Sequence, residues 1–352
     1  MPVRTQSVHT RRRVLPAIAA FATLLAVAGC DSAQTDDAAS SIVRTTTVIA
    51  GAGVVGVDRD TTTACPSPTP ADGASGTHQI SHAAGESTVP ADPERIVVLS
   101  TEALDTACAL GLWERVVGAA TLNGPTTQPS YLGTGIALIP SVGSIGAPDI
   151  AKIQDLHPDL ILGSQPPGSS DVRQLDGIAP TVFDGVAGDW QAQFLVGADA
   201  LGRKSAATQA LEDYHRDAHN AGIELNSLQT QASVVRFGAD SIHTLGPETF
   251  AGKVLADTGV RRPAYQNDAS TTVDAKDLDT VEGDIIYVSF DGEQGRKYGE
   301  SVMKTDEWKN LGAAEDHRIF AVDDTIWSGN GLVAARALVA DIRSSLNGFV
   351  SG

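Results

Sequence analysis

The three cysteines are the residues whose chemistry the sequence specifies most directly. Cys30 follows a positive stretch, Arg11 to Arg13, and an apolar run from Val14 to Val27 that ends in small residues. This run has the form of a secretory signal, and with about 14 residues it is too short to span a bilayer, which takes about 20. The small residues before Cys30 match a bacterial lipobox. We therefore expect cleavage before Cys30, acylation of its thiol, and a mature protein tethered by lipid on the outer side of the cell membrane.

Cys65 and Cys108 are the two cysteines left once Cys30 carries lipid. An even number of cysteines in an oxidising compartment favours a disulfide, and we expect these two to pair. The alternative is two unpaired thiols, with Cys108 buried as a small apolar residue within its helix.

The charge balance limits the classes of partner. Removal of the signal leaves 21 basic and 43 acidic residues, a net charge of about −22 on a chain of about 320 residues. Such an acidic protein is unsuited to nucleic acid or to docking on anionic lipid. A small anionic ligand remains compatible, because surface fields decay over about 8 Å at physiological salt and one buried arginine can dominate a cleft.

Other residue patterns that could do chemistry lack the context that the chemistry needs. Residues 51–56 match G-x-G-x-x-G, but a threonine run and a proline-rich segment follow where a dinucleotide site needs a helix and a second strand. His215 and His219 have the spacing of a metal pair, yet they lie beside the apolar face of their helix, which favours a solvated pair. The sequence shows no nucleophile elbow, no phosphate loop and no carboxylate pair at a catalytic spacing. We predict neither an enzyme nor a bound cofactor or metal.

The segments that must position a site begin after a polar stretch. Residues 31 to about 90 are rich in Ser, Thr, Asp, Ala, Gly and Pro, which indicates a flexible tether. Within it, Thr46 to Val57 is apolar enough to add a strand to the folded body. From Pro93 on, short continuously apolar runs alternate with helical patterns, as in parallel α/β proteins.

One long helix interrupts this alternation. From Lys204 to Leu228 the apolar residues recur every three or four positions, which predicts a helix of about 37 Å at about 1.5 Å per residue. The α/β pattern then restarts and continues to the last helix, expected from Gly331 to Leu346.

An ordered set of short motifs extends over about 260 residues, and none of them is specific alone. They are Arg95–Ser100, Ala109–Leu112, His157–Gly163, Ile178–Phe183, Asp189–Trp190, Ala200–Arg203, Val235–Phe237, Gly246–Phe250, Asp306–Trp308 and Val322–Trp327. Together they resemble the siderophore-binding lipoproteins that serve ABC importers, in which a helix forms the backbone between two lobes. The match is best to mycobacterial-type members, which share the cysteines corresponding to Cys65 and Cys108.

The resemblance implies an α/β fold of two parallel-sheet lobes joined by one long α-helix, with a ligand cleft between the lobes. Loops at the carboxyl ends of the strands would bind the ligand. The expected organisation is a lipoprotein signal peptide (1–29), a lipid-anchored flexible tether with an added strand (30–92), an N-terminal lobe (93–190), a linker helix region (191–230) and a C-terminal lobe (231–352).

The resemblance also implies the ligand residues. Arg236 corresponds to a cleft arginine whose planar fork suits siderophore oxygens, the alternative being an interlobe or surface salt bridge. Trp327 corresponds to a cleft tryptophan that packs on the ligand, the alternative being core packing. Tyr131 lies in a long loop that could reach the mouth of the cleft. Topology alone adds three residues that lie at strand ends, namely Ser100, Gln165 and Phe290.

The implied ligand is a ferric siderophore, which brings its own iron ligands, so iron would enter only as this complex. The implied partner is the permease of an iron importer, and the protein is expected to be a monomer. In relatives a glutamate on the helix before the His-Pro-Asp motif often pairs with a permease arginine. Ala151 occupies that position here, so coupling to a permease is in question. The alternatives are a haem-binding member, with Tyr131 or His243 as axial ligand, and an envelope interaction protein that has lost import.

Overall fold

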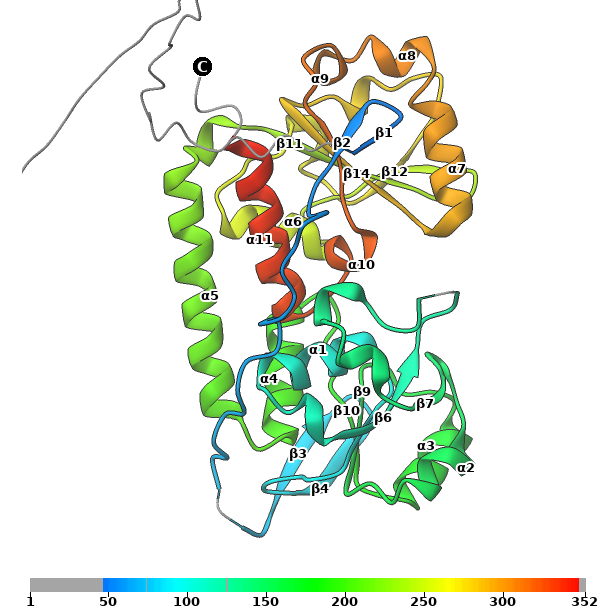
Figure 1. Cartoon of the computed structure of the whole chain (residues 1–352), viewed down its shortest axis with the longest axis vertical. Coiled ribbons are helices and arrows are strands. Elements are labelled where there is room, and N and C mark those ends of the chain that lie inside the picture. Colours follow the sequence, from blue (N-terminus) through cyan, green and yellow to red (C-terminus); the bar gives the residue numbers. More distant parts are fainter. Residues whose placement is uncertain (1–46, 74, 125, 348–352) are drawn as a thin grey trace, which may run out of the picture. The chain divides into compact units, whose positions relative to one another are not determined.

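The computed structural model describes residues 47–73, 75–124 and 126–347, so the signal and Cys30 lie outside the described residues. The described residues belong to one compact unit. This unit contains two separate large sheets, around which we define an N-terminal and a C-terminal lobe (Figure 1). The predicted α/β fold is confirmed, and the sheets of both lobes contain parallel strands. None of the helices in the described ranges combines the length and the apolar composition needed to cross a membrane.

The sheet of the N-terminal lobe has the strand order β10-β9-β5-β6-β7-β8, and only the pair β7–β8 is antiparallel. Alternate residues of its strands enter different cores: Ile96 and Val98 pack with α1 and α4, whereas Val97 packs with α2 and α3. Both faces are therefore covered, which explains why the strands are continuously apolar in sequence. The bounds are β5 (Ile96–Val98), β6 (Val116–Thr121), β7 (Ser141–Ser144), β8 (Ala147–Pro148), β9 (Leu160–Gly163), β10 (Thr181–Phe183), α1 (Thr101–Ala109), α2 (Ile150–Asp155), α3 (Ser169–Asp176) and α4 (Trp190–Ala200).

The sheet of the C-terminal lobe has the order β1-β2-β15-β14-β11-β12-β13. Strands β2, β15, β14 and β11 run parallel, and antiparallel strands complete both edges. The bounds are β1 (Val48–Ile49), β2 (Ala52–Val54), β11 (Ala232–Phe237), β12 (Ile242–Thr244), β13 (Thr271–Val273), β14 (Ile285–Phe290), β15 (Ile319–Ala321), α6 (Phe250–Asp257), α7 (Gly292–Val302), α8 (Asp306–Lys309), α9 (Gly312–Glu315) and α10 (Asp324–Trp327).

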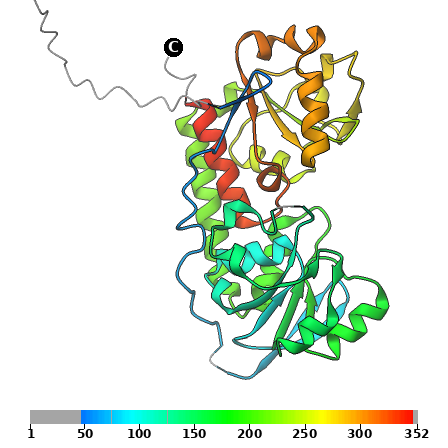
Figure 2. The same cartoon turned by 45° about the vertical axis from the view of Figure 1, so that its right-hand side comes forward.

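The predicted long helix is α5 (Lys204–Glu224), unbroken over 21 residues. It ends slightly earlier than expected, because Asn226 adopts a left-handed conformation with φ 49°. Helix α11 (Leu332–Leu346) packs alongside α5 (Figures 1 and 2), so α5 is not the solitary link that the sequence suggested.

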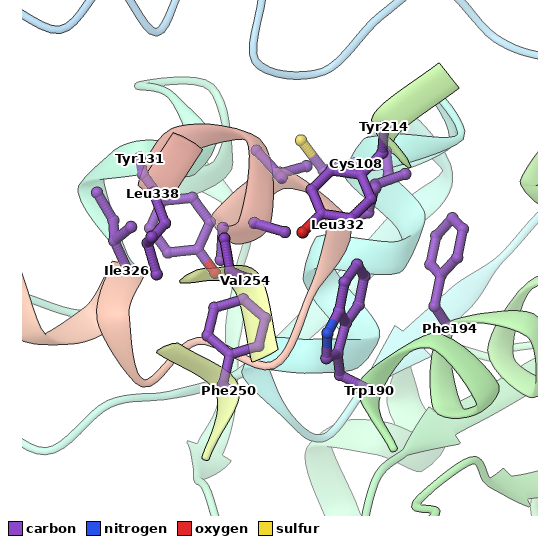
Figure 3. Close-up of a cluster of buried hydrophobic side chains, with 14 of the residues drawn as sticks. Cys108, Tyr131, Trp190, Phe194, Tyr214, Phe250, Val254, Ile326, Leu332 and Leu338 are labelled. Atoms are coloured by element: carbon purple, nitrogen blue, oxygen red, sulfur yellow. The ribbon is translucent and has the colours of Figure 1, made fainter. Parts of the chain in front are cut away.

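A shared apolar core surrounds these two helices. Trp190 of α4 packs edge-on against Tyr214 of α5 at 5.3 Å and against Phe250 of α6 at 5.7 Å between ring centroids. Figure 3 shows these rings together with Phe194 of α4 and Leu332 of α11. Since α4 belongs to the N-terminal lobe and α6 to the C-terminal lobe, one core joins both lobes to the helical backbone.

The described part of the expected tether, from residue 47 to residue 92, is folded onto the lobes, and this corrects the expectation of a flexible segment there. Its later half forms a hairpin of β3 (Thr77–His82) and β4 (Gly85–Pro90), which is anchored by the buried side chains of Ile80 and Val89. Sequence composition indicated flexibility because the residues are mostly polar, yet several of the few apolar ones, among them Val55, Ile80 and Val89, are buried against the lobes.

We call residues 47–73 the strap, because this segment runs from one lobe to the other (Figures 1 and 2). At its start β2 pairs with β15, so the segment from Thr46 to Val57 does contribute strands to the C-terminal lobe. In its middle Arg59 pairs with Asp341 of α11. Near its end the structure joins Cys65 to Cys108 of α1 in a disulfide, the pairing that the sequence predicted.

Candidate functional site

The carboxyl ends of the C-terminal lobe strands place Arg236 in a charged cluster. Its Nε and Nη2 donate to the two carboxylate oxygens of Asp324 at 2.7 and 2.9 Å, and Asp291 lies 3.2 Å from Nη2. Ser289 donates to Asp324 at 2.9 Å. The hydrogen bond with Asp324 raises the pKa of Arg236 above its ordinary value. The Nη1 of Arg236 donates to no residue within 47–73, 75–124 or 126–347, so this group can still bind a ligand.

The strand ends of the N-terminal lobe hold a second polar cluster. Ser100 follows β5, caps α1 by accepting from the backbone N–H of Ala103, and lies 2.8 Å from the hydroxyl of Ser164. Ser164 follows β9, donates to Glu102 at 3.2 Å and accepts from Gln193 at 2.8 Å. These side chains hydrogen-bond to one another, so the protein itself holds the cluster in place without a ligand.

Asp184 follows β10 and completes that cluster. Its side chain is 1% exposed. Burial, and after it the negative charge of Glu102, raises the pKa of Asp184 well above its usual range, although Ser164 and Gln193 lower it.

Asp105 ties the N-terminal lobe to the last helix. It extends from α1 and accepts from the backbone N–H groups of Val333 and Ala334 at 2.9 and 3.0 Å, in the first turn of α11. Tyr131 donates to the same carboxylate at 3.1 Å. Burial raises the pKa of Asp105 to about 6, although these hydrogen bonds lower it. Asp105 thus supplies the cap that the helix N-terminus needs.

A pocket of about 520 Å³ lies where the two lobes and the strap meet. The N-terminal lobe contributes Tyr131 and its neighbours in the loop after β6, and the C-terminal lobe contributes Phe290 and Asp323 from its strand ends. Its volume lies in the range of small-molecule sites, about 300–1,000 Å³. The strap forms the remaining wall with residues from Val54 to Thr61. A further pocket of about 750 Å³ lies between the strap and α11.

The structure brings only some of the predicted ligand residues to this pocket. Tyr131 and Phe290 line it, and Arg236 lies at the neighbouring strand end. Ser100 is held within the N-terminal lobe cluster, and Gln165 is exposed after β9. The binding roles of these five residues stay predictions.

Trp327 is not placed where the sequence prediction requires it. Its side chain is 1% exposed, its ring lies 4.5 Å from that of Tyr287, and its Nε1 donates to Asp341 at 3.1 Å. This placement corresponds to the alternative of core packing. Trp327 is the last residue of the short helix α10, and this helix directs the indole inward, which sequence position cannot reveal.

The haem alternative finds little support in the geometry. The hydroxyl of Tyr131 is committed to Asp105, and its side chain is 2% exposed. His243 lies on β12, where its Nε2 is 3.0 Å from the hydroxyl of Ser241. Across the described ranges, no group of three or more His, Cys, Asp and Glu side chains is arranged to hold a metal ion.

Sequence reasoning missed most of the acidic residues at the strand ends. Asp291 follows β14, Asp323 and Asp324 follow β15, and Glu102 lies in the first turn after β5. The rule that selected Phe290, its position at the end of a strand, would have selected them too. Burial raises the pKa of Tyr131 most and Asp105 comes next, with smaller contributions from Glu102 and Asp323, which belong to opposite lobes. Negative charge from both lobes therefore acts on the loop that carries Tyr131.

Comparison with known proteins gives a consistent set of matches. The family model described as periplasmic binding protein matches residues 96–325. The probable siderophore-binding lipoprotein YfiY of Bacillus subtilis is 28% identical over 285 residues, 76% of this chain and 87% of that protein. The petrobactin-binding protein YclQ of Bacillus subtilis is 25% identical over 274 residues, 73% of this chain and 84% of that protein. The crystal structure of Staphylococcus aureus SirA complexed with staphyloferrin B superposes with a TM-score of 0.64 at 26% identity, covering 77% of this chain and 99% of that one.

Proposed function

The chain belongs to the periplasmic binding protein family, and on this basis we propose that it captures a ferric siderophore outside the cell and hands it to an ABC importer. The relatives named above are described as binders of siderophores. The observation that carries the proposal is the pocket of about 520 Å³ bordered by strand ends of one lobe and a loop of the other. A binding protein of this family has no need of catalytic residues, and we propose none.

The residues around the pocket suit a bulky complex that brings its own iron ligands. Phe290 offers an apolar surface that is stacked on Phe237 with ring centroids 5.7 Å apart. Arg236 offers the N–H groups of Nη1 to ligand oxygens, while Asp324 holds the rest of its fork in place. A guanidinium fixed in this way loses little conformational freedom when it binds, which favours affinity.

The location and the partners follow from the same proposal. Acylation of Cys30 would anchor the protein to the outer side of the cell membrane, and the protein would act as a monomer. Docking on a permease would use exposed acidic residues. Ala151 is exposed on α2 and cannot supply one, whereas Asp155 on the same helix and Asp274 in the C-terminal lobe are exposed carboxylates. We propose that docking relies on residues of this kind in place of position 151.

The proposal is tested by titrating ferric siderophores of the hydroxamate, carboxylate and catecholate classes into the purified protein. The fluorescence of the four tryptophans should be quenched in a saturable way at micromolar or lower concentration. Each iron-free siderophore and a ferric nitrilotriacetate solution serve as controls for absorption by the complex and for free iron. The absence of a saturable response to all three classes at about micromolar concentration would contradict the proposal.

Import is tested separately in cells. Deletion of the gene should abolish uptake of the radiolabelled ferric siderophore that binds, and a copy that carries Cys30→Ala should restore less uptake than the unchanged copy. Unchanged uptake in the deletion strain, together with altered envelope properties, would favour the alternative of an envelope protein that has lost import.

A further inference from the structure

The strap is the part of the described chain that is least expected near a ligand. The family model begins at residue 96, so all of the strap, residues 47–73, precedes it. Composition suggested that this segment was only a tether. In the structure it instead borders both of the pockets described above.

The strap is fixed at three points, so it can act as a wall. On the C-terminal lobe side β2 pairs in parallel with β15, and Val55 donates to the carbonyl of Ala321 at 3.0 Å. In the middle Arg59 pairs with the nearly fully buried Asp341 and donates to the carbonyl of Ala337 at 3.1 Å. On the N-terminal lobe side the disulfide closes the segment onto α1. The residues between these anchors have little freedom to move away from the pocket.

The wall presents an apolar surface. Val54, Val55 and Val57 line the pocket of about 520 Å³ together with Phe290 and Ile326 of the C-terminal lobe. Val57 is 58% exposed, and it is the member of the three that is open to an incoming molecule. It directly follows Gly56, whose φ of 77° bends the chain at this point.

We propose that the strap is one wall of the ligand site and that Val57 contacts an apolar part of the bound ferric siderophore. This inference rests on the proposed function and adds to it a specificity residue outside the region that the family model covers. The strap would therefore help to select ligands by their size and apolar shape. A rigid apolar surface binds a complementary apolar group more tightly and excludes a larger one.

The sharpest test uses a matched pair of valines. Val48 is also on the strap and is 65% exposed, but it lines neither pocket. Val57→Trp should weaken binding of the ferric siderophore by about tenfold or more, because the indole fills space that the ligand needs. Val48→Trp should leave the dissociation constant within about twofold of that of the unchanged protein. Urea unfolding of both variants shows whether either change has altered the fold.

A second measurement does not depend on tolerance of a large side chain. Val57→Cys and Val48→Cys are labelled with a thiol reagent with and without saturating ferric siderophore. Ligand should slow labelling at position 57 by about tenfold and leave position 48 unchanged, as expected of a contact residue. Provided that the unchanged protein binds the siderophore, either of two results would overturn the inference. One is equal affinity of the two tryptophan variants for the siderophore, and the other is an equal labelling rate at position 57 with and without ligand. If the unchanged protein binds no siderophore, the proposed function itself fails.

Discussion

Removal of the disulfide is the perturbation whose size can be worked out most directly. Cys65 and Cys108 are 43 residues apart in sequence. A cross-link that closes a loop of this length lowers the entropy of the unfolded chain by about 13 cal/mol/K, which corresponds to about 4 kcal/mol at 25 °C. Cys65→Ala combined with Cys108→Ala should therefore lower the free energy of unfolding by about 4 kcal/mol. That loss is a large part of the total of about 5–15 kcal/mol for a typical domain.

The measurement is urea unfolding followed by circular dichroism, with the oxidised protein, the double variant and the reduced unchanged protein compared. The reduced protein should resemble the double variant, because both lack the cross-link, and this control separates the cross-link from the loss of the two sulfur atoms. A loss below about 1 kcal/mol at an unchanged m-value would refute the reasoning. It would mean that the bridge does not restrict the unfolded chain and that the strap is held by its other contacts alone.

The remaining predictions concern three side chains. Burial raises the pKa of Asp105 to about 6 from 3.8, so the folded protein binds this proton more tightly than the unfolded chain does. The contribution of Asp105 to stability must then fall by about 3 kcal/mol as the pH rises from about 4 to about 6. The stability difference between Asp105→Asn and the unchanged protein should vary with pH by this amount in urea unfolding, and a pH-independent difference would contradict it. Arg236→Lys should weaken siderophore binding by about tenfold, because an ammonium cannot reproduce the fork. The same variant should change stability by less than about 1 kcal/mol, because the ion pair is partly exposed; equal affinity in a fluorescence titration would remove Arg236 from the site. Trp327→Phe should lower the free energy of unfolding by about 1–3 kcal/mol, since Asp341 loses a buried donor, and should leave the affinity unchanged. Loss of affinity at full stability would instead restore Trp327 as a ligand residue.

The candidate site was only partly predictable, and the residues show why. Strand-end positions can be found in a sequence because parallel strands have recognisable apolar runs, and this rule selected Phe290 and Ser100 correctly as strand-end residues. The rule cannot tell which way a side chain points. Phe290 is the last residue of β14 and lines the pocket, whereas Trp327 ends the helix α10 that follows β15 and is buried.

Arg236 shows a second limit of sequence reasoning. Its position at the end of β11 was evident, but its partner Asp324 lies 88 residues further along the chain. Only the parallel pairing of β11 with β14, and of β14 with β15, brings the two together. Whether an arginine is free for a ligand or already paired is decided by such contacts between distant segments.

By itself the sequence determined the two α/β lobes, the long helix between them and the pairing of Cys65 with Cys108, because these features depend on local periodicity and on cysteine count. Tertiary structure alone decided that residues 47–73 form a strap, that α11 shares the role of α5, and that Asp105 caps α11 across the lobes. Each of these depends on contacts between residues far apart in sequence, whose free energy appears only when the chain is folded. Local composition carries no record of such contacts, and for that reason a stretch whose composition indicates a tether lines the pocket in the folded protein.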